Sequence, residues 1–132
     1  MDFWNNKSVL ITGGTGSLGK KLTNHILTHF PEVRKVVIFS RDEQKQFQMA
    51  QDFPESEYPA IRYFIGDVRD LERLKRATED VDLVFHAAAL KHVPKIEYNP
   101  FEAIKTNVVG SQNVIDACLT NNVEKVVCVG TD

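Results

Sequence analysis

The sequence contains few cysteines, little net charge and no long apolar run, and each shortage excludes a class of protein. Its 132 residues include two cysteines, Cys118 and Cys128, both in apolar periodic segments. We therefore expect buried free thiols in a reducing cytosol rather than a disulfide. The net charge of −2 gives no indication of nucleic acid or an anionic membrane as partner. Apolar runs such as 83–85 and 126–129 are too short to span a bilayer, and residues 1–7 do not resemble a signal peptide. We expect a cytoplasmic protein without a membrane segment in this chain.

Short apolar segments alternate with helical patterns along the chain. The expected strands are continuous, β-branched apolar runs, typical of strands covered on both faces; they span 8–12, 36–40, 61–65, 82–87 and 125–129. The expected helices span 18–30, 41–53, 71–77 and 100–120; Pro31 ends the first and Pro100 suits the first turn of the last. The acidic segment 54–60, which holds two prolines, is where we expect disorder.

Apolar spacing groups residues on one side of two of these helices. In the helix over 41–53, the residues on one side are Phe47, Ala50 and Phe53. In the helix over 100–120, a 4-3-4-3 spacing predicts one face toward a core, made of Ile104, Val108, Ser111, Ile115 and Cys118.

A glycine-rich loop directly follows the first expected strand and opens the first helix. Gly13, Gly16 and Gly19 form G-x-x-G-x-x-G. The first glycine allows a sharp turn, the second lets a pyrophosphate approach the backbone, and the third lets helix and strand pack closely. The helix N-terminus adds free N–H groups and partial positive charge. The loop therefore predicts a dinucleotide site, with a plain flexible turn as the alternative; its other members are Thr15, Ser17 and Leu18.

The order of strands and helices then predicts an α/β fold of the Rossmann type. Such a fold is a doubly wound parallel sheet with right-handed crossovers, helices on both faces and strand order 3-2-1-4-5. The length suits one NAD(P)-binding domain over 1–132. A complete six-stranded domain is usually longer, so we expect a C-terminally truncated fold with five strands, in which the substrate-binding part is absent.

The end of the second strand indicates which dinucleotide is bound. NAD enzymes usually place Asp or Glu there to accept from the ribose hydroxyls, whereas this chain has Ser40 and Arg41. Arg41, with Ser40 and with Lys45 one helical turn later, could bind a 2′-phosphate, for which guanidinium offers paired donors. Asp42 would repel a phosphate if it turned inward, and Arg41 could simply be solvated. We favour NADP, with NAD as the alternative.

Two further loops are expected beside the cofactor. Asp67 and Val68 follow the third strand, where Asp67 could accept from the exocyclic amine of adenine; alternatively it caps a helix, for which Asp70 is also available. Ala87, Ala88 and Ala89 close the fourth strand. Their small side chains leave space for ribose and pyrophosphate, although an alanine run also suits plain close packing.

These motifs resemble a known family. The glycine loop 12–19, the segments 66–69 and 86–89, and Asn107 are similar to the extended short-chain dehydrogenase/reductase family. More specifically, the chain resembles the inverting UDP-N-acetylglucosamine 4,6-dehydratases, which make precursors of bacterial surface sugars such as pseudaminic acid. The segments that carry this resemblance are 40–43, 63–70, 87–94, 97–100 and 105–107, and Ala-Ala-Ala-x-Lys-His-Val at 87–93 is the most specific.

The resemblance implies a lyase that holds NADP tightly and acts on a UDP-sugar, with no metal. Hydride leaves C4 of the sugar, water is eliminated across C5 and C6, and the hydride returns to C6 with inversion at C5. Thr131 and Asp132 match catalytic positions, Lys91, His92 and Thr131 match substrate positions, and Lys91 and Asn107 match cofactor positions. Lys91 and His92 could instead be solvated, Asn107 could bridge within its helix, and Asp132 could be a frayed end. Gly130 departs from the family, where a hydroxyl residue is commoner.

The Tyr-x-x-x-Lys motif of the family does not occur in this chain. None of its tyrosines has a lysine four residues later; they are Tyr58, Tyr63 and Tyr98. The motif supplies the acid/base for hydride transfer, so we expect these 132 residues to be inactive alone. We also expect the strand over 125–129 to form an unprotected edge, and the helix over 100–120 to expose an apolar stripe for a covering helix or a dimer partner. A homo-oligomer is therefore expected.

Two alternatives remain open. A UDP-sugar 4-epimerase or reductase shares the scaffold, although its fifth strand more often ends in two hydroxyl residues than in Thr131 followed by an acid. A non-catalytic NADP-binding module would also fit the missing tyrosine.

Overall fold

The computed structural model describes residues 3–87 and 100–128, with residues 100–106 described by their backbone alone. Strands and helices alternate along these residues, in the order predicted. The strands are β1 (Ser8–Thr12), β2 (Lys35–Ser40), β3 (Ile61–Ile65), β4 (Leu83–His86) and β5 (Lys125–Cys128). The helices are α1 (Ser17–His29), α2 (Glu43–Asp52), α3 (Leu71–Ala77) and α5 (Pro100–Thr120).

The strands form one parallel sheet in the order β3-β2-β1-β4-β5, which confirms the predicted topology. The first strand lies in the centre, where Leu10 pairs with Val37 of β2 and with Val84 of β4. Every residue of β1 is buried. The chain therefore turns outward from β1 to one edge of the sheet and later returns to build the other half.

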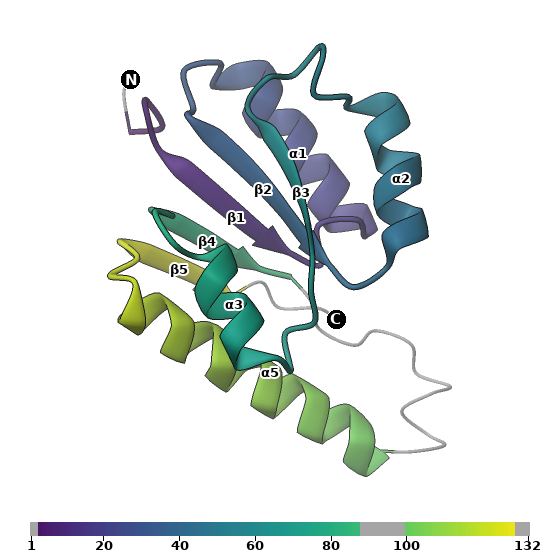
Figure 1. The fold of residues 1–132 in the computed structure, drawn as a ribbon, viewed down its shortest axis with the longest axis vertical. Helices are drawn as coiled ribbons and strands as arrows, with labels where there is room; N and C mark the ends of the chain where they lie inside the picture. Colours follow the sequence, from purple (N-terminus) through teal and green to yellow (C-terminus); the bar gives the residue numbers. More distant parts are fainter. Residues whose placement is uncertain (1–2, 88–99, 129–132) are drawn as a thin grey trace.

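Two hydrophobic cores sandwich the sheet because alternate strand residues point to opposite faces. Val9 and Ile11 belong to the core with Ile26 of α1 and Met49 of α2. The intervening Leu10 belongs to the other core, whose helical members come from α3 and α5. In Figure 1, α1 and α2 accordingly cover one face of the sheet while α3 and α5 cover the other.

Side-chain caps explain where two helices begin. Asp42 accepts from the backbone N–H of Lys45 at 3.0 Å and starts α2, which is therefore shorter than the predicted 41–53. Asp70 accepts from the backbone N–H of Arg73 at 3.1 Å and starts α3. Both carboxylates meet N–H groups that have no partner within their helix. The Asp42 carboxylate is thus held at its own helix start.

The predicted core-facing side of α5 is only partly right, because Cys118 is buried but two other members are not. Val108 and Ile115 are 62% and 43% exposed. The stripe of α5 that packs on the sheet instead includes Gly110, Val114, Ala117 and Cys118. This stripe is buried because α5 approaches Val68 closely at Gly110, where an added Cβ would lie only 2.7 Å from Cγ2 of Val68. The helix carries two apolar stripes, and spacing alone does not rank them.

In α2 the residues turned toward the sheet are Gln46 and Met49, whereas Phe47 is 68% exposed. Phe53, at the helix end, does pack against the core. Both cysteines are free, as predicted, but only Cys118 is buried; Cys128 is exposed because β5 lies at the sheet edge.

The exposed stripe of α5 confirms the prediction of unpartnered apolar surface beside the last strand. Its members include Val108 and Leu119, the latter 71% exposed, and Val127 on β5 is 39% exposed. Figure 1 shows α5 and β5 along the same side of the molecule. Neither in residues 3–87 nor in 100–128 does a helix have the length and apolar character needed to cross a membrane.

The segment 54–60, expected to be disordered, forms a hydrogen-bonded turn. The backbone N–H of Tyr58 donates to the carbonyl of Pro54 at 2.9 Å, and the hydroxyl of Tyr63 donates to the carbonyl of Phe53 at 2.8 Å. Acidic and proline-rich composition therefore did not predict disorder here, because a strand residue anchors the turn.

Candidate functional site

The carboxyl ends of parallel strands meet at one edge of the sheet, and in this topology ligands bind at that edge where the strand order reverses. Here the reversal falls between β1 and β4. The segments that follow β1, β2, β3 and β4 at this edge begin at Gly13, Arg41, Gly66 and Ala87. Residues predicted separately from four places in the sequence are thus brought to one side of the molecule.

The glycine loop makes a tight turn out of β1. Gly13 has φ of 63°, a conformation that glycine adopts without steric cost, and the N–H of Gly16 donates to the carbonyl of Gly13 at 3.0 Å. Gly19 allows α1 to pack on the loop, because a Cβ there would lie 2.5 Å from the carbonyl oxygen of Gly14. Two of the three predicted glycine roles are therefore visible in the backbone.

The start of α1 lies at the same edge and carries no side-chain cap. Gly16 is the N-cap and makes no side-chain cap, and the first turn contains no acidic residue. Gly16 and Ser17 are exposed, whereas Thr15 is buried beneath them. The first N–H groups of a helix lack internal partners and carry the positive end of the helix dipole. This surface can hold a phosphate or pyrophosphate group.

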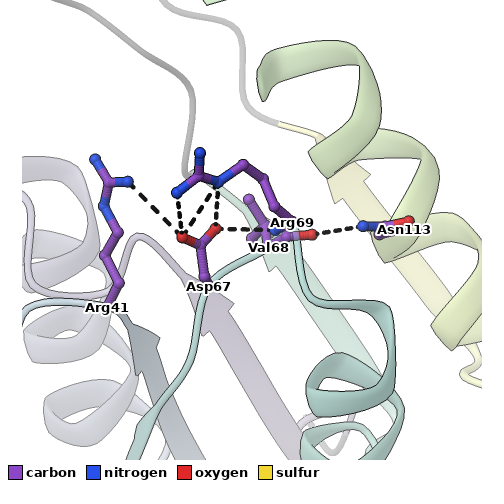
Figure 2. Close-up of polar contacts among 5 residues, drawn as sticks. All are labelled: Arg41, Asp67, Val68, Arg69 and Asn113. Atoms are coloured by element: carbon purple, nitrogen blue, oxygen red, sulfur yellow. Dashed lines mark hydrogen bonds and ion pairs between the residues drawn. The ribbon is translucent and has the colours of Figure 1, made fainter. Parts of the chain in front are cut away.

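The residue after β2 and the loop after β3 form an ion-pair cluster (Figure 2). Asp67 accepts from Nη2 of Arg69 at 2.8 Å and from the Arg69 backbone N–H at 2.9 Å. Nη1 of Arg41 lies 3.8 Å from the same carboxylate. The pKa of Asp67 is lowered mainly by the hydrogen bonds from the Arg69 side chain, against a smaller opposing effect of burial. Asp67 is therefore a charged acceptor, while Asp70 takes the helix-capping role.

Ser40 and Gln46 tie the ends of β2 and β3 together. Nε2 of the buried Gln46 lies 2.9 Å from Oγ of Ser40 and 3.1 Å from the carbonyl oxygen of Phe64. Ser40 is itself buried, and Lys45 is exposed on the first turn of α2. Sequence reasoning missed Gln46. Gln46 stands three positions before Met49, so the two residues share one face of α2. The spacing of the apolar residues in this helix does not mark that face as buried.

A second network joins the ends of β1 and β4 to α5. Oγ1 of Thr12 lies 2.7 Å from Nδ1 of His86 and accepts from the Ala87 N–H at 3.0 Å, and Oγ of Ser111 lies 3.3 Å from Nε2 of His86. Burial lowers the pKa of His86, which favours the neutral form of the ring. The network holds Ala87 beside the glycine loop. Sequence reasoning missed it because its members are far apart in the chain.

Helix α5 also supports the loop after β3. Nδ2 of Asn113 donates to the carbonyl of Val68 at 2.9 Å (Figure 2), and Val68 is buried against the core. Asn107 is half-buried and lies six residues earlier on the same helix. The remaining predicted site residues lie outside the described residues: Ala88, Ala89, Lys91, His92, Thr131 and Asp132.

Proteins of known activity resemble this chain over nearly its whole length. An inverting UDP-N-acetylglucosamine 4,6-dehydratase of Campylobacter jejuni is 57% identical over 129 residues, 98% of this chain and 37% of that protein. A UDP-glucose 4-epimerase of Rickettsia bellii is 45% identical over 129 residues, 96% of this chain and 37% of that protein. The chain thus spans little more than a third of the length of the curated relatives it matches.

Solved structures show the same architecture. The X-ray structure of Pen from Bacillus thuringiensis has a TM-score of 0.88 and 46% identity, over 96% of this chain and 37% of that one. A double mutant of DesIV, a dTDP-glucose 4,6-dehydratase from Streptomyces venezuelae with NAD and DAU bound, has a TM-score of 0.77 and 28% identity, over 89% of this chain and 37% of that one. The likeness therefore supports a nicotinamide dinucleotide as the cofactor of this fold.

The resemblance to dehydratases of the short-chain dehydrogenase/reductase type is confirmed by these relatives and by the match of residues 9–132 to a family model. The match starts inside β1 and includes the glycine loop, the ion-pair cluster and α5. The chain therefore belongs to the polysaccharide biosynthesis protein family.

Proposed function

We propose that this chain is the NADP-binding portion of an inverting UDP-N-acetylglucosamine 4,6-dehydratase that acts in nucleotide-sugar and surface polysaccharide biosynthesis. The observation that carries the proposal is the open, uncapped start of α1 after the glycine turn, set beside the Arg41–Asp67 cluster at the carboxyl edge of the sheet. The identity of 57% to a dehydratase of this specificity supports the substrate class. The proposed domain covers residues 1–132.

The described residues fit a dinucleotide. The N–H groups at Ser17, Leu18 and Gly19 would hold the pyrophosphate, because the N-cap residue Gly16 makes no side-chain cap. Asp67 would accept from the adenine amine, with Val68 beside it, and Ala87 would leave room for the ribose. Arg41, Ser40 and Lys45 would hold a 2′-phosphate, which favours NADP over NAD. When bound, the nicotinamide supplies reversible hydride transfer.

Other residues of the chain are proposed to act on the sugar. Thr131 would orient the substrate hydroxyl, and Asp132 would assist the leaving hydroxyl as an acid. Lys91 and His92 would contact the UDP-sugar, and Lys91 and Asn107 would also support the cofactor, as would Ala88 and Ala89. Because no tyrosine of this chain has a lysine four residues later, we propose that the chain alone does not turn over UDP-N-acetylglucosamine.

We further propose a cytoplasmic location and a homo-oligomer. The first is supported by two cysteines that are both free thiols. The second is supported by the exposed apolar stripe of α5, since apolar side chains grouped on one helix face favour association.

A UDP-sugar 4-epimerase is the second candidate, because a relative at 45% identity bears that name. Thr131 followed by Asp132 favours the dehydratase, since eliminating water requires an acid beside the leaving hydroxyl. A non-catalytic NADP-binding module is the third candidate. Joining this chain to the remainder of its parent protein and following UDP-N-acetylglucosamine separates the three, because they predict a 4-keto-6-deoxy product, a C4 epimer, or no conversion.

The first experiment is calorimetric titration of the chain with NADP and with NAD. We expect NADP to bind at least about tenfold more tightly, since a paired guanidinium–phosphate contact contributes more than about 1.4 kcal/mol. Arg41→Ala should remove the preference, while Arg76→Ala, at an exposed position in the last turn of α3, should retain it. Equal affinities would refute the 2′-phosphate assignment. Binding of neither dinucleotide by a folded chain would refute the site.

A further inference from the structure

The two arginines of the ion-pair cluster hold Asp67 unequally. Arg69 forms a forked contact: Nη2 lies 2.8 Å from Oδ2, and Nε lies 3.2 Å from Oδ1 and 3.3 Å from Oδ2. Nη1 of Arg41 is 3.8 Å from Oδ2, which is beyond hydrogen-bond distance. Figure 2 shows the two guanidinium groups approaching the same carboxylate from separate elements. Arg69 is therefore the principal partner of Asp67.

Within the described residues, two guanidinium groups approach one carboxylate, and Arg69 makes the closer, forked pair. The Arg41 side chain lies in the open, since it is 62% exposed whereas the Asp67 side chain is 28% exposed. An exposed, loosely paired arginine costs little to redirect toward another anion, because such ion pairs contribute at most about 1 kcal/mol.

Removing Arg69 would change which anion Arg41 pairs with. Asp67 would then have one arginine partner in this cluster in place of two, and Arg41 is already close enough to take that role. A carboxylate fully paired with Arg41 would compete with a phosphate for the same guanidinium donors, and would repel the phosphate as well.

On this basis we propose that Arg69 determines dinucleotide specificity by occupying Asp67, which leaves Arg41 available for the 2′-phosphate. The proposal rests on the proposed function, in which a dinucleotide lies along this edge with its adenosine ribose near Arg41. Arg69 acts through Asp67 and is a positioning residue, with no required contact to the cofactor.

A double-mutant cycle on Arg69 and Asp67 tests this mechanism. The quantity to measure is the ratio of the Kd for NAD to the Kd for NADP, by calorimetry, in wild type, Arg69→Gln, Asp67→Asn and the double variant. Arg69→Gln should lower the ratio roughly three- to fivefold, as expected for redirecting one exposed ion pair. The double variant should recover the ratio of Asp67→Asn, because no carboxylate is left to capture Arg41. Asp67→Asn also alters the proposed contact between residue 67 and adenine. That loss should weaken the binding of NAD and NADP equally, so it cancels in the ratio.

Controls separate this mechanism from simple loss of charge. Arg76→Gln removes the same charge from the exposed face of α3 and should leave the ratio unchanged. Arg69→Lys keeps the charge without the forked contact and should give an intermediate ratio. An NMR titration without cofactor provides a second readout: the pKa of Asp67 should rise more in Arg69→Gln than in Arg41→Gln.

The outcomes are distinct. An unchanged ratio in a folded Arg69→Gln variant would overturn the proposal. If wild type still bound NADP more tightly than NAD, the proposed function would stand. An equal fall of the ratio with and without Asp67 would mean direct phosphate contact by Arg69 and would also overturn it. A wild type without preference for NADP would remove both the cofactor assignment and this inference.

Discussion

Nδ1 of His86 lies 2.7 Å from Oγ1 of Thr12, so the imidazole links the ends of two neighbouring strands at the carboxyl edge. The same hydroxyl accepts from the N–H of Ala87. A hydroxyl that accepts from a backbone amide can donate its proton to an unprotonated ring nitrogen. This relationship makes the charge state of His86 important for the geometry of the site.

The stability of the fold should fall as pH decreases below about 6.5. Burial lowers the pKa of His86 in the fold, whereas the unfolded chain takes up a proton near the ordinary value of 6.5. Below that pH the unfolded state binds more protons, so acid favours unfolding. Urea titrations from pH 7.5 to 5.5 would measure the effect. His86→Gln should reduce the pH dependence, while His25→Gln, at an exposed position of α1, should preserve it; equal slopes in all three proteins would contradict this account.

Alanine at two glycines of the loop should separate stability from binding. Gly19→Ala places a Cβ 2.5 Å from the Gly14 carbonyl oxygen, so we expect the free energy of unfolding to fall by about 2 kcal/mol. Gly16→Ala meets its nearest neighbour at 3.3 Å, so it should cost less than about 1 kcal/mol. It should nevertheless weaken dinucleotide binding more than tenfold, because a methyl group would keep the pyrophosphate from the backbone. Chemical denaturation and calorimetry on both variants measure the two effects; tight binding by a folded Gly16→Ala would contradict the second.

Lysine on the exposed stripe of α5 should reduce association without unfolding the chain. Val108→Lys and Leu119→Lys replace side chains that are 62% and 71% exposed, so the free energy of unfolding should change by less than about 0.5 kcal/mol each. Sedimentation velocity should show a lower average mass for the double variant than for wild type. Val114→Ala, at a position 1% exposed, is the matched control and should cost about 1–3 kcal/mol without changing the mass. Unchanged association in the lysine variants would exclude this stripe as the interface.

The two cysteines should react at very different rates with an aromatic disulfide reagent at pH 8. Burial, with a smaller effect of Cys128, raises the pKa of Cys118 to about 11, and Cys128 is exposed on the edge strand. The thiolate is the reactive form, so we expect one fast thiol in the native chain and a second only in denaturant. Cys128→Ser should lose the fast reaction and Cys118→Ser should retain it. A fast reaction in Cys128→Ser would show that α5 opens readily.

The fold was predictable from local patterns. Apolar runs such as 8–12 and 36–40 became strands because segments covered on both faces have no polar side to alternate with. The glycine loop, the available cap at Asp70 and the break at Pro31 are short-range features that a reader of the sequence can recognise, whereas the cap at Asp42 lies inside the helix predicted over 41–53. Strand order followed from the alternation of strands and helices, because right-handed crossovers leave few topologies.

The buried face of each helix and the pairing of side chains from different elements could not be predicted in the same way. Helix α5 has two apolar stripes, and the stripe with Gly110 is buried because that helix approaches Val68 closely. Ion pairing of Arg41 with Asp67 joins residues from different strands, and sequence reasoning assigned each of them to the cofactor without seeing the contact. In α2, the apolar residues Phe47 and Phe53 fall on one side of the predicted helix, yet Gln46 and Met49 are the helix residues that are buried.

The sequence by itself determined the α/β order, the position of the glycine turn and the family, because these depend on neighbouring residues and on period. Tertiary structure alone decided which side of α5 is buried, that Thr12 meets His86 across 74 positions, and that Arg69 holds Asp67 more closely than Arg41 does. Such contacts depend on the distance between packed elements and on which charged side chain lies closest to its partner. The local periodicity of the sequence contains no information on these distances.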